Sequence, residues 1–383
     1  MQLELSEEQR MIRASALAWL GGSYDFRQRE ASVHRDGGAP SAWAAFAEMG
    51  WLGLPLPESA GGLGAGLLET CLLLQAMGRF LVVEPYHAYV VQAARLLACV
   101  GTTAQQAAWL PGVVTGEHRI ALAHAEAGDA LPWSPRGTRA LRNGDGWILD
   151  GAKRAVVSAP GCVRWIVSAR LADEGSTGLF LVNPGAAGVS TDAYDTTDGG
   201  RAADLVLRGV AAEHDACLAT TTEHALHAIV AEGLIGDCWY AVGAMQAAFQ
   251  QTVDHVQQRR QFGQALASLQ VVQHRIAEMA VQCAEAEAAC ELATLRAVRD
   301  GTAAADAACI ARSKVVRAAR YVAQNCVQLH GAMGVCEELP IAAAFRALTT
   351  FSQRGGDASA LAAAYGQGLL ASGAFAHSQV LHV

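Results

Sequence analysis

The sequence predicts a mostly α-helical protein with a β insert: an N-terminal helical domain, a small middle β barrel or sandwich, and a C-terminal four-helix bundle. The 383 residues exceed the roughly 250–300 at which a single hydrophobic core stops growing, so several subdomains are expected. Apolar residues recur with a helical period at both ends of the chain, and short strand-like runs replace that period in the middle. The expected boundaries place the three domains at residues 1–115, 116–222 and 223–383.

The first block, from Ser6 to about Gly112, has a helical pattern. Ser6 is followed by two glutamates and a glutamine, which is typical of a helix N-cap with acids in the first turn. Prolines and glycines between residues 53 and 64 interrupt the pattern. They predict a structured loop, because neither residue type supports a regular element over that span.

The middle block consists of short apolar runs bounded by Gly, Asp, Asn or Pro, which indicates strands. The turn signal Asn143-Gly144-Asp145-Gly146 separates two of them. Even spacing predicts a compact antiparallel barrel or sandwich. The expected strands cover residues 120–123, 146–149, 163–169, 177–182 and 203–207.

The third block contains long segments rich in alanine and other strong helix formers. They predict an antiparallel bundle of helices at about 223–260, 268–299 and 302–329. A last helical stretch at 339–368 is expected to be interrupted at Gly355 and Gly356.

The composition narrows the function classes. With 52% hydrophobic and 17% charged residues, the chain is drier than an average domain, which predicts buried surface in a homo- or hetero-oligomer such as a dimer or tetramer. The net charge of −8 and the lack of a run of cations exclude a nucleic-acid partner. The ten cysteines form no CxxC pair, so reduced thiols are expected. No secretory signal and no charge-free apolar window of about 20 residues is found, so we expect a cytoplasmic protein without a membrane span.

Two strings that end in glycine carry most of the chemistry. They are Arg259-Arg260-Gln261-Phe262-Gly263 and Gln328-Leu329-His330-Gly331-Ala332-Met333-Gly334. The arginines also suit a helix C-terminus as dipole-complementing charges, and Gly331 suits a left-handed C-cap. However, a guanidinium matches phosphate oxygens with a bidentate fork. Backbone amides exposed by a Gly-rich turn, with the Gln328 carboxamide, suit the ribose or phosphate part of a dinucleotide.

Six features in this order resemble the acyl-CoA dehydrogenase family over essentially the whole chain. They are the domain order, the loop at 53–64, the strand at 120–126, the string Gly151-Ala152-Lys153-Arg154-Ala155-Val156-Val157-Ser158, and the two glycine-terminated strings. Within the family, residues 242–263 and 345–357 are most similar to the divergent small subunits of paired enzymes.

The resemblance implies FAD held between two subunits. The adenine diphosphate half would be contacted by Arg259, Phe262, Gln270, Gln328, Gly331 and Ala332. The ring site would come from two strands of the β domain, with Leu122, Ala125 and Glu126 on one and Ala155, Val157 and Ser158 on the other. The implied activity is α,β-desaturation of an acyl-CoA or carrier-bound acyl thioester in fatty acid metabolism, with a separate electron-transfer acceptor.

The family reaction needs a carboxylate base whose pKa is raised toward neutrality in a dry pocket. Relatives most often carry that glutamate in the segment aligned with 345–357, where this chain has Ser352-Gln353-Arg354-Gly355-Gly356. The usual Thr-Glu-Pro-Gly-Ala-Gly-Ser string is reduced to Ala125-Glu126-Ala127-Gly128-Asp129, and Ala155 replaces a tryptophan. We take Glu232 as the candidate catalytic base, with Asp237, Glu126 and Asp357 as alternatives.

Three hypotheses follow from the missing glutamate. The first is a partner subunit of a heteromeric acyl-CoA dehydrogenase, whose base lies on the other chain. The second is a self-sufficient flavoenzyme with a relocated base. The third is a binding or scaffold homologue without redox chemistry. Fold similarity alone does not separate them.

Overall fold

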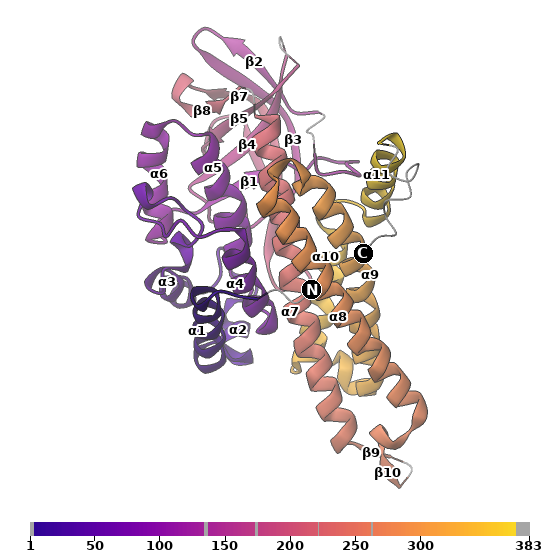
Figure 1. Ribbon diagram of the computed structural model, residues 1–383. Helices are drawn as coiled ribbons and strands as arrows, with labels where there is room; N and C mark the ends of the chain where they lie inside the picture. Colours follow the sequence, from indigo (N-terminus) through magenta and orange to yellow (C-terminus); the bar gives the residue numbers. More distant parts are fainter. Residues whose placement is uncertain (1–3, 134–136, 173–174, 221, 262, 373–383) are drawn as a thin grey trace.

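The computed structural model describes residues 4–133, 137–172, 175–220, 222–261 and 263–372. A helical domain, a β-sheet domain and an elongated helix bundle follow one another along the chain, and the bundle extends away from the other two at one end (Figure 1). The predicted fold class is confirmed. The predicted domain boundaries fall between α6 and β1 and between β8 and α7.

The N-terminal domain is helical, as predicted. Ser6 caps its first helix: the Ser6 Oγ accepts a hydrogen bond from the Gln9 amide at 3.1 Å, and the Gln9 side chain accepts one from the Ser6 amide. The elements are α1 (Glu7–Ser23), α2 (Phe26–Ser32), α3 (Pro40–Glu48), η1 (Trp51–Gly53), η2 (Glu58–Ala60), α4 (Leu67–Arg79), the π-helical η3 (His87–Ala94), α5 (Arg95–Val100) and α6 (Thr103–Val114).

The middle domain is one mixed sheet in the order β6-β7-β3-β2-β4-β5-β8, with β1 also paired to β4. The expectation of a purely antiparallel arrangement is wrong, because β1 and β2 both pair with β4 in parallel. A long connection joins β1 to β2, so they are not constrained to form a hairpin. The strands are β1 (Ile120–Ala123), β2 (Arg139–Asn143), β3 (Gly146–Val157), β4 (Arg164–Leu171), β5 (Thr177–Val182), β6 (Val189–Asp195), β7 (Arg201–Ala212) and β8 (Cys217–Ala219), with η4 (His214–Ala216) before β8.

The C-terminal domain forms the expected bundle, and its last helical stretch is interrupted at Gly355 and Gly356 as predicted. A small hairpin, β9 (Arg260–Gln261) and β10 (Gln264–Ala265), lies at the far end of the bundle from the sheet (Figure 1). The other elements are α7 (Glu223–Gln258), η5 (Leu266–Ser268), α8 (Gln270–Arg299), η6 (Gly301–Ala303), α9 (Ala304–His330), η7 (Gly331–Val335), α10 (Pro340–Gln353) and α11 (Ala358–Ala371).

Helix α7 joins the bundle to the N-terminal domain through a tight seam with α4. A Cβ on Gly243 would lie 2.0 Å from the Gln75 carbonyl oxygen, and a Cβ on Gly78 would lie 1.9 Å from the Tyr240 carbonyl oxygen. Only glycine allows the two backbones to approach so closely. By length and apolar composition α7 could cross a membrane, but 78% of its most apolar window is buried within the fold. Its apolarity is therefore accounted for by its position in the core.

All ten cysteines lie among the described residues, and none is disulfide-bonded. Six of them are buried, and burial raises the pKa of thiols such as Cys71, Cys283 and Cys326. This agrees with the predicted reduced, packed thiols.

Candidate functional site

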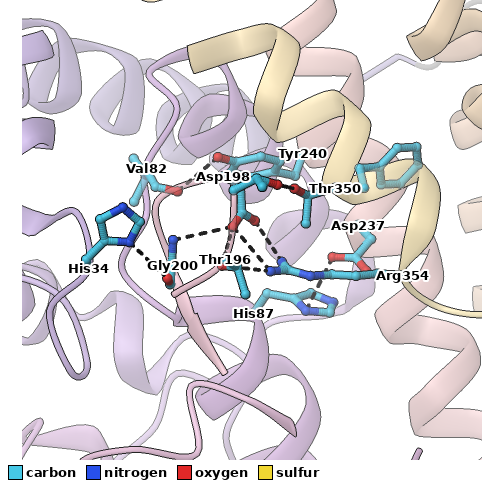
Figure 2. A network of polar contacts seen from close by, with 12 residues as sticks. His34, Val82, His87, Thr196, Asp198, Gly200, Asp237, Tyr240, Thr350 and Arg354 are labelled. Carbon is cyan, nitrogen blue, oxygen red and sulfur yellow. Dashed lines mark hydrogen bonds and ion pairs between the residues drawn. The ribbon is translucent and has the colours of Figure 1, made fainter. Parts of the chain in front are cut away.

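A cavity of about 570 Å³ opens where the three domains meet. Its wall is built from α4 and η3, the end of β1, the end of β3, the β6–β7 turn, α7, and the α10–α11 turn. Figure 2 shows the polar side of this region, where side chains from η3, the β6–β7 turn, α7 and α10 lie close together. Such a junction of domains is a common location for small-molecule sites.

Strand β3 contributes an irregular part of the wall. Ala155 and Ser158 have positive φ angles of 48° and 54°, which non-glycine residues seldom adopt. The strand register with β7 shifts between Lys153 and Val156. Backbone strain of this kind occurs preferentially at functional sites. Of the predicted ring-site residues, Ala125, Val157 and Ser158 all line the cavity, and the structure therefore brings them together.

A buried relay of hydrogen bonds lies behind this wall. Lys153 Nζ donates to Glu126 Oε1 at 2.7 Å and to Ser168 Oγ at 3.2 Å. The imidazole of His124 bonds Ser168 Oγ through Nδ1 at 2.8 Å and the Pro132 carbonyl oxygen through Nε2 at 3.0 Å. Since a carbonyl only accepts, Nε2 carries the proton, and Nδ1 accepts from the serine hydroxyl.

This relay determines the charges behind the wall. Burial and the nearby Lys153 ammonium lower the pKa of His124 to about 4, so the imidazole is neutral near pH 7. Burial alone would raise the pKa of Glu126, but the contact with Lys153 outweighs it and lowers that pKa to about 2. Glu126 is therefore an ionised partner of Lys153 rather than a base.

Helix α7 presents one carboxylate to the cavity, and it is Asp237. His87 Nε2 donates to the Gly233 carbonyl oxygen at 2.8 Å, because that carbonyl can only accept. The other ring nitrogen, Nδ1, lies 3.4 Å from Asp237 Oδ1 (Figure 2). A favourable contact between these two atoms requires one proton, which the pair must share.

The sequence-predicted base, Glu232, lies elsewhere. Its Oε2 is 2.6 Å from Arg95 Nη2, and Glu232 is not part of the cavity wall. The geometry therefore does not support Glu232 as the base. The reason is helical rotation: the five residues from Glu232 to Asp237 turn the side-chain direction by about 140°, at roughly 100° per residue.

The α10–α11 turn contributes a cation, Arg354, to the cavity wall. Arg354 Nη1 lies 3.0 Å from Asp198 Oδ2 of the β6–β7 turn (Figure 2). Behind the turn, the fully buried Arg312 donates through Nη2 to the Phe351 carbonyl oxygen at 2.7 Å and to that of Arg354. Its guanidinium carbon lies 4.6 Å from the centroid of the Phe351 ring. The α10–α11 turn is thus held by Asp198 on one side and by Arg312 on the other.

Among the described residues, the carboxylates that line the cavity all have partners. Glu84 accepts from Tyr24 Oη at 2.6 Å, and Asp357 caps α11 by accepting from the Ala360 amide at 2.7 Å. Asp129 accepts from the Glu126 amide. The full set is Glu84, Asp129, Asp198, Asp237 and Asp357. Of these five, Asp237 is the one that lies next to a histidine ring nitrogen, that of His87.

The two glycine-terminated segments meet at the far end of the bundle. His255, one turn before Arg259, stacks on His330 of α9 with ring centroids 4.2 Å apart and planes 22° apart. Arg259 is exposed and forms no ion pair within the part of the chain that the structure describes. Gly263 and Gly331 have positive φ angles, and a Cβ on either would meet open space.

The other residues predicted to bind the adenine diphosphate half of FAD, the tail of the cofactor, lie at the same end of the bundle. This end is the tail end of the chain's bundle. Gln270 begins α8, Gln328 is in the last turn of α9, and Gly331 and Ala332 begin η7. All four are exposed. Phe262 lies outside the described residues. This donor set of a cation, amides and bared backbone suits a diphosphate with its ribose.

The tail end and the cavity are well separated along one helix. The 22 residues from Asp237 to Arg259 on α7 correspond to about 33 Å at 1.5 Å per residue. The tail end therefore does not belong to this chain's own cavity.

Sequence reasoning missed several residues of the cavity. No sequence motif indicated them, because each acts through a neighbour distant in sequence. They are His87, His124, Asp198 and Arg354. The π-helical turn at His87 also has no reliable sequence signal, although such turns are frequent at functional sites.

Comparison with known families identifies two matching domain models. Residues 6–117 match the family model "Acyl-CoA dehydrogenase, N-terminal domain", and residues 227–368 match "Acyl-CoA dehydrogenase, C-terminal domain". The acyl-CoA dehydrogenase FadE27 of Mycobacterium tuberculosis is 28% identical over 78% of this chain and 80% of that protein. The mitochondrial long-chain specific acyl-CoA dehydrogenase of Mus musculus is 27% identical over 79% of this chain and 73% of that protein.

Two solved structures are similar to this chain over nearly its whole length. A chain of the Tcur3481–Tcur3483 steroid ACAD superposes with a TM-score of 0.86 at 31% identity, covering 96% of this chain and 99% of that one. A chain of the ChsE4–ChsE5 complex from Mycobacterium tuberculosis superposes with a TM-score of 0.88 at 25% identity, covering 97% and 99%.

Proposed function

Because this chain belongs to the acyl-CoA dehydrogenase family of FAD-dependent oxidoreductases, we propose that it is one of two unlike subunits of such an enzyme. In this proposal it supplies the nucleotide-tail half of a flavin site whose ring half lies on its partner. The assembly would act in the cytoplasm on a bulky acyl-CoA or carrier-bound acyl thioester and pass electrons to a separate acceptor.

One contrast within the chain carries the proposal. The tail end retains an exposed Arg259 beside two open glycine turns, whereas the α10–α11 turn holds Arg354 paired to Asp198 and no carboxylate base. A chain that has the exposed tail site but lacks a carboxylate base in this turn is suited to complete another chain's flavin site. The two-component names of the Tcur3481–Tcur3483 and ChsE4–ChsE5 structures support the same assignment.

The residues have distinct tasks in this scheme. Arg259 would hold the diphosphate by charge-assisted hydrogen bonds. Gln270, Gln328 and the backbone at Gly331 and Ala332 would orient the ribose and adenine. When bound, FAD supplies a hydride acceptor for desaturation of the acyl chain. The partner subunit would supply the carboxylate that removes the α-proton.

Purification with and without a partner tests the proposal. We expect the chain alone to be colourless or poor in FAD, and to become yellow when co-expressed with a neighbouring homologue that carries the family glutamate. The flavin should then be bleached by an acyl-CoA. A chain that stays colourless in every combination contradicts the flavin assignment and favours the non-redox scaffold homologue.

The second candidate, a self-sufficient dehydrogenase, is favoured by one observation: His87 and Asp237 both line the cavity, with His87 Nδ1 3.4 Å from Asp237 Oδ1. If the chain alone binds about one FAD and is bleached by an acyl-CoA, this candidate replaces the first. Asp237→Asn should then abolish turnover. Glu232→Gln is the matched control, because Glu232 pairs with Arg95 outside the cavity wall.

A further inference from the structure

The stacked imidazoles of His255 and His330 lie beside the proposed diphosphate site. His255 lies in the last turn of α7 and Arg259 is its C-cap residue, near enough for the guanidinium to lower the pKa of His255. His330 ends α9, and its Nδ1 lies 2.8 Å from the Cys326 carbonyl oxygen. Because a carbonyl only accepts, Nδ1 carries a proton, and Nε2 is the ring nitrogen that can take up another.

Protonation of the stack is unfavourable when no anion is present. Partial burial, the neighbouring His330 ring and the Arg259 guanidinium lower the pKa of His255. These are the groups that act on it: Arg259 from its own helix and His330 from α9. Two imidazoles at 4.2 Å next to an arginine form a cluster with repulsion among like charges, which an anion would relieve.

We infer that His255 and His330 form, together with Arg259, a proton-dependent diphosphate site, in which the histidine pair takes up a proton when the anion binds. This inference rests on the proposed function, since the diphosphate it names is that of a dinucleotide seated at the tail end. The histidines are thus additional ligand-binding groups rather than packing residues.

The linkage between proton uptake and anion binding determines the sign of the pH dependence. An anion that favours the protonated pair binds more tightly as the pH falls, and its binding is accompanied by proton uptake. A charge-assisted contact in a partly exposed site makes FAD retention about tenfold stronger at pH 5.5 than at pH 8. A purely structural stack would leave FAD retention independent of pH over this range.

The test follows FAD release from the purified FAD-containing assembly by flavin fluorescence between pH 5.5 and 8. His255→Phe and His330→Phe keep an aromatic stack and remove the titrating nitrogens. His330→Gln provides a second, smaller variant that still has an amide able to donate to the Cys326 carbonyl. We expect the tenfold slope in the wild type and little slope in each variant. His224→Phe, an exposed histidine at the opposite end of α7, is the control and should keep the slope.

The outcomes separate this inference from the proposed function. An undiminished pH slope in the His255 and His330 variants overturns the inference but leaves the tail site intact. Unchanged FAD retention in Arg259→Ala removes the tail site and the inference with it. Free CoA also carries a diphosphate, so its binding is measured in parallel. A histidine-dependent slope for CoA with none for FAD supports the diphosphate site and contradicts the FAD assignment.

Discussion

Gly355 lies directly against the buried guanidinium of Arg312. A Cβ at position 355 would be 3.1 Å from Arg312 Cζ and 2.5 Å from Leu234 Cδ2, and the φ angle of Gly355 is 67°. Gly355 lies in the segment 345–357, where the resemblance to the family places the glutamate of most relatives. The left-handed backbone and the packing both disfavour a side chain there.

Gly355→Glu should therefore destabilise the protein and should not create a working base. Left-handed backbone strain and the clash with Leu234 together cost on the order of 2–4 kcal/mol. Urea denaturation checks the stability, and bleaching of flavin by acyl-CoA checks the activity. Gly366→Ala is the control, since a Cβ at that helical glycine meets open space. Dehydrogenase activity in the Gly355→Glu chain alone would contradict the proposed division of labour.

Arg259→Ala should weaken FAD retention by about ten- to a hundredfold, because a charge-assisted phosphate contact contributes about 1.5–3 kcal/mol. FAD content after gel filtration of the assembly measures the effect. Arg299→Ala is the matched control, since it also removes an exposed arginine at the end of a long helix. Equal FAD content in both variants would exclude Arg259 from the diphosphate site.

The pair Arg354–Asp198 should couple the α10–α11 turn to the sheet domain. Its atoms are 3.0 Å apart, and both side chains are partly buried. A double-mutant cycle with Arg354→Ala and Asp198→Ala should give a coupling of about 0.5–1 kcal/mol that falls with added salt. Purely additive single-variant effects would show that the contact does not hold the two domains together.

His124 should make the sheet domain sensitive to acid. Burial and Lys153 lower its pKa from 6.5 to about 4, so between these values the unfolded chain binds a proton that the folded chain does not. Stability therefore rises with pH across the window from about 4 to 6.5, by on the order of 3 kcal/mol. The full stabilisation linked to the neutral His124 imidazole should be present above pH 6.5.

The measurement is the urea midpoint at several pH values. In His124→Leu the slope in this window should flatten, while stability near pH 7 falls because Ser168 and the Pro132 carbonyl lose a partner. An unchanged slope in that variant would mean that the imidazole is not neutral in the folded protein.

Local signals predicted the fold well, since the capping box at Ser6, the apolar periods and the paired glycines at 355 and 356 act over a few residues. The sheet was less predictable: the parallel pairing of β1 with β4 joins residues more than 40 apart in sequence. The same limit applies to the cavity. The segments ending at Arg259 and Gln328 were recognisable strings, whereas the contacts His87–Asp237 and Arg354–Asp198 exist only after three domains have packed.

The close contact between Gly243 and Gln75 holds α7 against the N-terminal domain near the cavity. Because α7 is one continuous helix from the cavity to the tail end, a change in its tilt displaces the tail end more than the cavity. A tilt of about 2° at Asp237 moves Arg259 by about 1 Å over the 33 Å between them, taking 1.5 Å per residue. If the tail end binds a nucleotide as proposed, a shift of α7 at the cavity would move that binding site by a comparable distance.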